Sequence, residues 1–439
     1  MTQAARRVQG WLAMNAFTIL LPLLSAGPGD ASGFAKSLAL VGDLDGDRCS
    51  EIAVGSPSDG DQHRGKLFLF SGKTGALLRE LVGDAPDGAF GSDVASVGDQ
   101  DGDKVPDFAV AAPFVRGEGM EGSVTIYSGK DGKPIRTLAP IAGERYFGTD
   151  LVSIGDLNGD KKDELLVRCR AGTGPEEHER FVAITLSTGK RMYAVDSPAG
   201  VTSHDMGRPL ARVPDVDGDK IPDFAVEYAS DVRVCSGKDG KLLRTLVAPI
   251  PPTDKSSFGF SICSMSGKVP IVAVGDILDE LHGSIRLFAI ESVGDAGAAE
   301  KEGGGAALSG DDGFSGVGRS LANAGDLNHD GVEDVAAGWT DGRIGGILLL
   351  SGSDLASVRT IPDEPDKGQI PLGWRIAAGL DVDGDGTPDV AVSRYWPTAP
   401  AASARGVVVV SGADGHVLHA LASPGPPPEK KTPAKPTAK

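Results

Sequence analysis

One sequence pattern recurs seven times along this chain of 439 residues, and no other feature constrains the fold as strongly. The copy that begins at Phe90 reads FGSDVASVGDQDGDKVPDFAVAAP, and the copy at Phe147 reads FGTDLVSIGDLNGDKKDELLVRC. A fixed period of this length is typical of repeat folds, in which each unit buries its apolar surface against the next. Successive copies start 52 to 59 residues apart, at Phe34, Phe90, Phe147, Met206, Phe258, Val317 and Leu372.

Each copy predicts four short strands. A strand with alternating apolar residues precedes an acidic loop, and an apolar strand such as Phe108 to Ala112 follows it. A third strand (Val124 to Tyr127) leads through the turn SGKDG into a fourth (Ile135 to Leu138), which is typical of a β-hairpin. No segment shows helical periodicity, so the chain is predicted to be all-β: a seven-bladed β-propeller of four-stranded antiparallel blades.

The propeller is predicted to span residues 32–422. The first copy begins with its innermost strand and the last one ends with an outer strand. We therefore expect the ring to close by packing of blades, without a strand shared between the two ends.

The two ends of the chain differ from the repeats. Residues 1–31 combine two arginines, an apolar run from Trp11 to Leu24 and a stretch of small residues. This pattern predicts an export signal peptide, with a retained membrane anchor as the alternative. Residues 423–439 are rich in Pro and Lys and are predicted to be disordered. No other stretch is apolar enough to span a bilayer, so a secreted, periplasmic or cell-surface protein is expected.

Composition limits the classes of partner. The chain has 61 acidic and 43 basic residues, a formal charge of -18, and this acidity argues against nucleic acid as the partner. The four cysteines have neither zinc-site nor redox-motif spacing. They are predicted to be small buried residues, and the sequence leaves their disulfide state open; they are Cys49, Cys169, Cys235 and Cys263.

Six of the seven copies carry the loop D-x-[DN]-x-D-x-x-x-[DE] between the first and second strands, and we call these the acidic loops. Calcium prefers six to eight oxygen ligands, whereas magnesium resists full dehydration by protein groups. Side chains at loop positions 1, 3, 5 and 9, with the carbonyl of position 7, can converge on one ion. The spacing therefore predicts up to six Ca²⁺ sites. The fifth copy has GKVP at residues 267–270 instead and is predicted to bind no metal.

The predicted metal ligands are Asp43, Asp45, Asp47 and Glu51; Asp99, Asp101, Asp103 and Asp107; Asp156, Asn158, Asp160 and Glu164; Asp215, Asp217, Asp219 and Asp223; Asp326, Asn328, Asp330 and Asp334; and Asp381, Asp383, Asp385 and Asp389.

The repeated segments resemble FG-GAP repeats, which form the β-propeller of integrin α subunits and of many bacterial secreted proteins. The FG element stands at residues 90–91, 147–148 and 258–259, and the GAP element at residues 55–57 and 111–113. The resemblance covers roughly residues 34–421. It implies a seven-bladed propeller with calcium in the hairpin loops of one face.

The acidic loops depart from the integrin form at position 6, which is Gly there. Only Gly331 and Gly386 follow that form, and weaker metal sites are expected in the other loops if position 6 requires a positive φ angle. This departure, and the absence of an insertion large enough for an extra adhesion domain, are more similar to the bacterial secreted type. The remaining four loops have Arg48, Lys104, Lys161 and Lys220 at this position.

No catalytic motif accompanies the repeats, so the chain is not expected to be an enzyme. The leading interpretation is a secreted, calcium-binding, monomeric propeller that serves as a protein-binding or adhesion scaffold. The alternative is a carbohydrate-binding lectin, or a lyase or hydrolase acting on polysaccharide, built on the same propeller. The partner is therefore an extracellular protein or a glycan. Trp339, Tyr395 and Trp396 could contact such a partner, and the other interpretation is that they pack against strand ends.

Overall fold

The structure is a computed structural model that describes residues 33–115, 121–199, 210–228, 231–247, 258–276, 283–290, 299–300, 305–310, 316–340, 344–363, 372–394 and 405–424. The predicted signal peptide and nearly all of the predicted disordered tail lie outside these ranges. Among the described residues, no helix has the length and apolar character of a membrane span.

Within the described residues the fold consists of seven separate sheets, and in each of them four main strands follow one another in chain order from the inside outwards. Blades 1 to 3 contain β1 (Ser37–Leu40), β2 (Ile52–Ser56), β3 (Lys66–Phe70) and β4 (Leu77–Val82); β5 (Val94–Gly98), β6 (Asp107–Ala112), β7 (Ser123–Tyr127) and β8 (Pro134–Leu138); and β10 (Leu151–Gly155), β11 (Glu164–Ala171), β12 (His178–Thr185) and β13 (Lys190–Asp196).

Blades 4 to 7 continue the same plan with β14 (Leu210–Val213), β15 (Asp223–Tyr228), β16 (Asp231–Cys235) and β17 (Leu242–Val247); β18 (Ser261–Met265), β19 (Ile271–Asp276), β20 (Ser284–Ala289) and β22 (Ala307–Ser309); β23 (Ser320–Gly325), β24 (Asp334–Thr340), β25 (Gly345–Leu350) and β26 (Ser357–Asp363); and β27 (Ile376–Leu380), β28 (Asp389–Arg394), β29 (Gly406–Val410) and β30 (Val417–Ala422).

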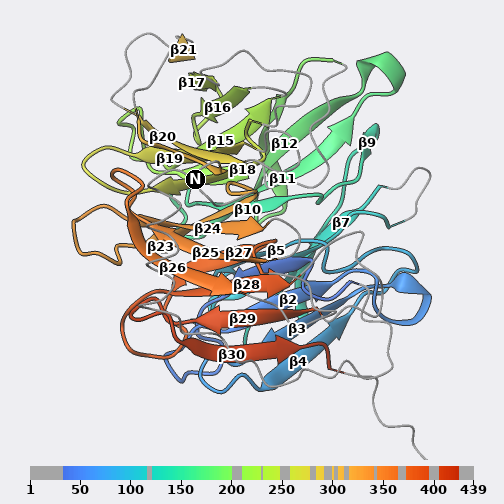
Figure 1. The fold of residues 1–439 in the computed structure, drawn as a ribbon. Helices are drawn as coiled ribbons and strands as arrows, with labels where there is room; N and C mark the ends of the chain where they lie inside the picture. Colours follow the sequence, from blue (N-terminus) through green and yellow to red (C-terminus); the bar gives the residue numbers. More distant parts are fainter. Residues whose placement is uncertain are drawn as a thin grey trace, which may run out of the picture.

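Only short elements depart from this plan in the described part of the chain. Strand β9 (Glu144–Arg145) pairs with β11, and β21 (Ala299–Glu300) runs parallel to the edge of β17. Two single-turn 3-10 helices, η1 (Asp61–His63) and η2 (Gly174–Glu176), lie in the loops between second and third strands. The prediction of an all-β propeller with seven four-stranded antiparallel blades is confirmed (Figure 1).

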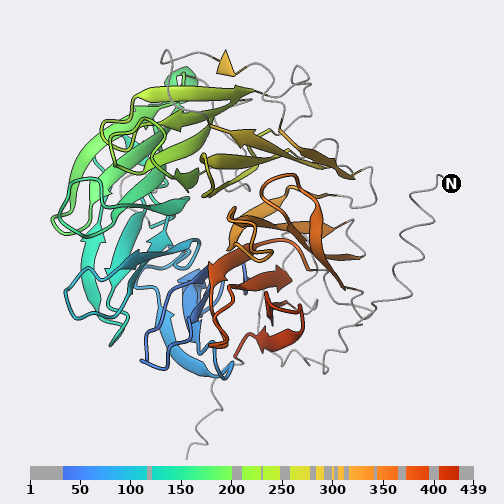
Figure 2. The ribbon, with the colours of Figure 1, turned by 90° about the vertical axis from the view of Figure 1, so that its left-hand side faces the viewer.

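The seven blades surround a common axis (Figure 2). The innermost strands β1, β5, β10, β14, β18, β23 and β27 contact one another in this order around the ring. Each of them pairs antiparallel with the second strand of its blade, so all seven run from one face of the ring to the other. The acidic loops follow the ends of six innermost strands and therefore lie together on one face.

The first and last blades pack directly against each other where the ring closes. Phe34 and Leu38 belong to the same buried cluster as Ala377 and Val382. The Ser50 amide also donates a 2.8 Å hydrogen bond to the Asp381 carbonyl. The sheets of these two blades contain only β1–β4 and β27–β30, so in the described structure no strand is shared between the chain ends, as expected.

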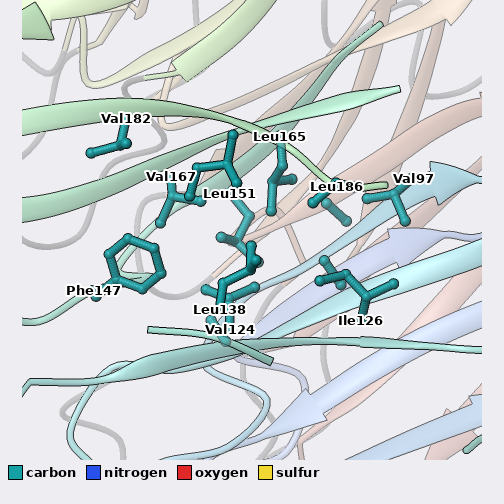
Figure 3. Close-up of a cluster of buried hydrophobic side chains, with 14 of the residues drawn as sticks. Val97, Val124, Ile126, Leu138, Phe147, Leu151, Leu165, Val167, Val182 and Leu186 are labelled. Atoms are coloured by element: carbon teal, nitrogen blue, oxygen red, sulfur yellow. The ribbon is translucent and has the colours of Figure 1, made fainter. Parts of the chain in front are cut away.

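The core lies between the blades rather than inside one sheet. In Figure 3, Val124, Ile126 and Leu138 of blade 2 pack against Leu151 and Val167 of blade 3. A lone four-stranded sheet would expose both faces to water, and stacking blades in a ring buries them. The second strands β6, β15 and β28 are consequently buried at every residue, whereas the outer strand β4 is largely exposed.

All four cysteines are buried and unbonded, which confirms the prediction of small buried residues.

Candidate metal centre

The six acidic loops share one backbone conformation. The residue at position 6 has a left-handed φ angle whether it is a basic residue, as in Lys104 (φ 70°), or glycine, as in Gly331 (φ 85°). Position 4 is left-handed as well, and it is glycine in every loop except for His329 (φ 60°). Position 6 thus requires a positive φ, which costs a residue with a Cβ about 1 kcal/mol.

The carboxylate at position 1 organises each loop from within. In blade 2, Asp99 Oδ1 accepts a hydrogen bond from the Gly102 amide (2.6 Å), and Oδ2 accepts one from the Lys104 amide (2.8 Å). Asp103 then accepts from the amide of Val105 at position 7 (2.9 Å). Desolvation raises the pKa of Asp99, but these backbone donors outweigh it and hold the pKa below its usual value.

The carboxylate at position 9 is fully buried at the start of the second strand. Asp107 Oδ2 accepts from the Gln100 amide at position 2 (2.6 Å). Its Oδ1 accepts from the Gly129 amide (2.9 Å), which belongs to the turn between the third and fourth strands. The same two contacts recur in the loops that end with Asp223, Asp334 and Asp389.

Burial and crowding raise the pKa of these position 9 carboxyls. Desolvation is the largest cause in each, and the other carboxylates of the loop add to it. The pKa is raised to about 7 for Glu51, Glu164 and Asp223, and to about 6 for Asp389. A bound cation would favour the ionised form and relieve this electrostatic cost.

Four loops bring three carboxylates together, with one oxygen of each within 4.8 Å of the others. The loops at Asp156 and Asp326 have Asn at position 3 and form no such group of three acids in the described structure. There, the Asn158 amide nitrogen donates to Glu164 Oε1 (2.5 Å). The groups are Asp43, Asp45 and Glu51; Asp99, Asp101 and Asp107; Asp215, Asp217 and Asp223; and Asp381, Asp383 and Asp385.

The first loop contains a buried oxygen that fits the ligand set of a cation. Glu51 Oε2 accepts a hydrogen bond from the Leu44 amide (2.5 Å), whereas Oε1 has no hydrogen-bond partner among the described residues. A buried acceptor without a donor is costly unless another positive group satisfies it. Hard carboxylate oxygens of this kind are what calcium prefers, so the residues present fit the ion.

The fifth copy has a different arrangement at the corresponding place. The Ser266 amide donates to Glu333 Oε2 of the next blade (2.6 Å), and the Glu333 amide donates to the Ser266 carbonyl (3.0 Å). Contacts between protein groups therefore connect this loop to blade 6. That it binds no metal stays a prediction.

A set of contacts between blades was missed by reasoning from sequence. Arg79 of blade 1 donates to the carbonyls of Gly129 and Lys130 (3.0 Å each) in the blade 2 turn. Arg79 stands eight places after the serine that opens its own turn, and this spacing is the signal that could have revealed the set. We call these contacts the interblade latches; equivalent donors are Arg136, Tyr193, Arg359 and, across the ring closure, His419.

The predicted partner-binding aromatic residues are not gathered on a described surface. Trp339 lies in β24, is only 7% exposed and belongs to a buried cluster with Leu321 and Leu348. Trp339 therefore packs in the core, and a role in partner binding stays a prediction. Tyr395 and Trp396 lie outside the described residues.

Comparison with known proteins agrees with this architecture. The family model described as FG-GAP repeat matches residues 372–410. Integrin alpha pat-2 of Caenorhabditis briggsae is 39% identical over 119 residues, which cover 24% of this chain and 10% of that protein. Human integrin alpha-7 is 36% identical over 155 residues, covering 32% and 12%, and integrin alpha-4 of Xenopus laevis is 30% identical over 159 residues, covering 33% and 15%.

The chain thus spans between 10% and 15% of the length of these three relatives. The matched repeat coincides with blade 7, and the other blades share its strand order. Residues 372–410 therefore carry an FG-GAP repeat within a seven-bladed β-propeller, and the chain is similar over part of its length to integrin α subunits.

Proposed function

We propose that this protein is an exported, calcium-stabilised and non-catalytic scaffold that binds an extracellular protein. The observation that carries the calcium part is the shared geometry of the six acidic loops, with a buried carboxylate at position 9 of each. Similarity to integrin α subunits supports the binding role. The residues that would hold the ions are the loop carboxylates and the two loop asparagines described above.

Calcium in this proposal stabilises the fold. An ion that binds only the folded state adds about 1.4 kcal/mol at a free concentration tenfold above its Kd, so six independent sites add about 8 kcal/mol. This sum is comparable with the whole stability of a typical domain, about 5–15 kcal/mol. The protein would therefore fold fully only where calcium is abundant, as it is outside cells.

Calcium removal tests the metal part of the proposal. Thermal unfolding of the full chain is followed in metal-depleted buffer and at increasing free Ca²⁺, with Mg²⁺ as the matched control. We expect the melting temperature to rise with each increase in Ca²⁺ and to respond much less to Mg²⁺. A melting temperature that does not change with calcium would contradict the proposal.

Export and partner binding need separate measurements. Expression of the full chain should place the protein outside the cytoplasm, with an N-terminus near residue 32 by mass spectrometry.

The calcium-loaded protein is then immobilised and exposed to extracellular proteins and to a glycan array. Saturable binding of a purified protein supports the scaffold, whereas turnover of a polysaccharide would show that the chain is an enzyme.

A further inference from the structure

A cavity opens on the axis of the ring at the face opposite the acidic loops. Its volume is about 340 Å³, and we call it the axial cavity. Residues two and three places after the repeat starts contribute to its lining in blades 1, 2, 3 and 7, because the innermost strands begin at this face. Those lining residues include Lys36, Ser92, Asp93, Thr149, Asp150 and Arg375.

The position of the cavity follows from side-chain size. Two places after the repeat start, blades 1, 2 and 3 carry Lys36, Ser92 and Thr149, of which two are small. Blades 5 and 7 carry Phe260 and Trp374 there, and the Arg319 guanidinium of blade 6 lies 5.7 Å and 5.1 Å from their ring centroids. Bulky groups thus fill one side of the axis and leave space on the other.

Two of the cationic side chains that line the cavity are committed to protein carboxylates. Arg168 is buried and donates to Asp150 Oδ2 (2.7 Å) and Glu179 Oε2 (2.8 Å). Arg170 donates to the other oxygen of Glu179 (3.2 Å) and lies over the Tyr146 ring. These contacts fix the wall of the cavity, so the two guanidinium groups are positioned before any ligand arrives.

Lys36 differs from these arginines. Within the part of the chain that the structure describes, its ammonium group makes neither a hydrogen bond nor an ion pair, although Asp93, Asp150 and Arg375 lie near enough to act on its charge. Desolvation is the main cause that lowers the pKa of Lys36, with Arg375 next. A desolvated cation without a hydrogen-bond acceptor is costly, and a carboxylate of a ligand would satisfy it.

The remaining lining offers an apolar edge and hydroxyl groups. The Phe114 and Tyr146 rings meet edge to face with centroids 5.9 Å apart, and Phe114 is 37% exposed. The Ser92 and Thr149 hydroxyls donate to backbone carbonyls, which leaves their lone pairs able to accept. Such a surface suits a sugar ring, whose apolar face packs on an aromatic side chain and whose hydroxyls donate to oxygen acceptors.

We propose that the axial cavity binds a uronic acid residue of an acidic oligosaccharide, with its carboxylate on the Lys36 ammonium. The sugar ring packs against Phe114 and Tyr146, and its hydroxyls donate to the acceptors of the wall. A neutral sugar lacks the charge that Lys36 requires, and an acidic peptide side chain lacks the ring and the hydroxyls. The inference goes beyond the proposed function and does not depend on it.

Titration calorimetry with trigalacturonate on the full chain tests this site, at low ionic strength and fixed free calcium. We expect saturable binding, and a Kd raised at least tenfold in Lys36→Met, about 1.4 kcal/mol. Lys190→Met is the matched control, because Lys190 is exposed on the outer strand β13, and its Kd should equal that of the wild type. Melting temperatures of all variants establish that they are folded.

Phe114→Ala gives a second variant if Lys36→Met fails to fold, since it removes an exposed ring. Its Kd should rise several-fold. Galactotriose and hexaglutamate are the comparison ligands, and both should bind at least tenfold more weakly than trigalacturonate. The proposal is overturned if trigalacturonate does not bind, if neither variant changes its Kd, or if either comparison ligand binds equally well.

Discussion

At the scale of single residues, loop position 6 adopts a conformation that side chains with a Cβ ordinarily avoid. Lys104 and its three basic counterparts have a strained positive φ angle there, whereas Gly331 and Gly386 adopt the same angle without this strain. The loop carboxylates impose it, because the position 6 amide must point at the position 1 carboxylate. Backbone geometry at this position is therefore set by the acidic side chains and not by the residue that occupies it.

Gly331→Ala isolates this backbone cost. A Cβ added at Gly331 would meet no atom within 4 Å, so only the positive φ is penalised. We expect the free energy of unfolding to fall by about 1 kcal/mol. Chemical denaturation at saturating calcium measures it, and a loss well above 2 kcal/mol would mean that contacts rather than backbone strain dominate.

The raised pKa values predict opposite pH dependence with and without calcium. Burial raises the pKa of the Glu51 carboxyl from its ordinary value of 4.5 to about 7, so the apo fold loses stability as pH rises between these values. Calcium needs the ionised form, so its stabilising effect should grow over the same range. Melting temperatures in metal-depleted buffer and with added calcium, from pH 4.5 to 7.5, measure both; parallel curves would contradict the assignment.

At the scale of elements, the turn between the third and fourth strands connects an acidic loop with the neighbouring blade. The Gly129 amide binds Asp107 of its own blade, and the Gly129 carbonyl accepts from Arg79 of the preceding one. A turn of this kind is more than a link between two strands, because both of its contacts reach beyond the hairpin. Both contacts use backbone atoms, so the side chains of the turn do not reveal them.

Gly129→Ala tests the contact between the turn and the acidic loop of its own blade. A Cβ at this residue would lie 1.9 Å from the Pro106 carbonyl oxygen, so the turn must move away from the acidic loop. We expect both a larger loss of stability than in Gly331→Ala and weaker calcium binding at the blade 2 loop. Calcium titration calorimetry of the two variants, at equal protein concentration, compares them; unchanged calcium affinity in Gly129→Ala would refute the connection.

Arg79→Met tests the contact between the turn and the preceding blade. It removes two hydrogen bonds from a charged donor to the next blade, and because Arg79 is partly exposed we expect a loss of about 1 kcal/mol in the free energy of unfolding. Lys190→Met, on another outer strand, serves as the control. Equal denaturation midpoints for the two variants would show that the interblade latch contributes nothing.

At the scale of the whole molecule, the sequence period predicts the blades because every blade is built from contacts close in the chain. Strand order, the acidic loops and the buried second strands such as Phe108 to Ala112 follow from local pattern. The axial cavity does not, because it depends on how the blades pack around the ring, and for the interblade latches the spacing from the turn serine indicates the donors but not the carbonyls that accept from them. Lys36 and Arg375, for instance, come together only when the ring closes.

The acidic loops were only partly predictable for a related reason. Their spacing indicates which carboxylates lie together, and four loops show such groups. It does not reveal that Gly129 supports Asp107 from a separate hairpin, or that Glu51 retains an unsatisfied buried oxygen. Those details depend on the length of the side chain at position 9, because Glu is one carbon longer than Asp. In four blades Asp at this position accepts a hydrogen bond from the turn glycine, and the other two blades have Glu there.

The shared use of one turn also has a consequence for how such a ring changes as copies diverge. A turn that supports an acidic loop and accepts an interblade latch is under two constraints at once. A substitution that disrupts one of the two contacts therefore weakens the selection that keeps the other. The fifth copy, which lacks the acidic loop, also lacks an SGxxG turn between its third and fourth strands. Loop and turn should therefore be lost together only in blades with Asp at position 9, because the third copy keeps its acidic loop with Glu164 although its turn reads TLSTG.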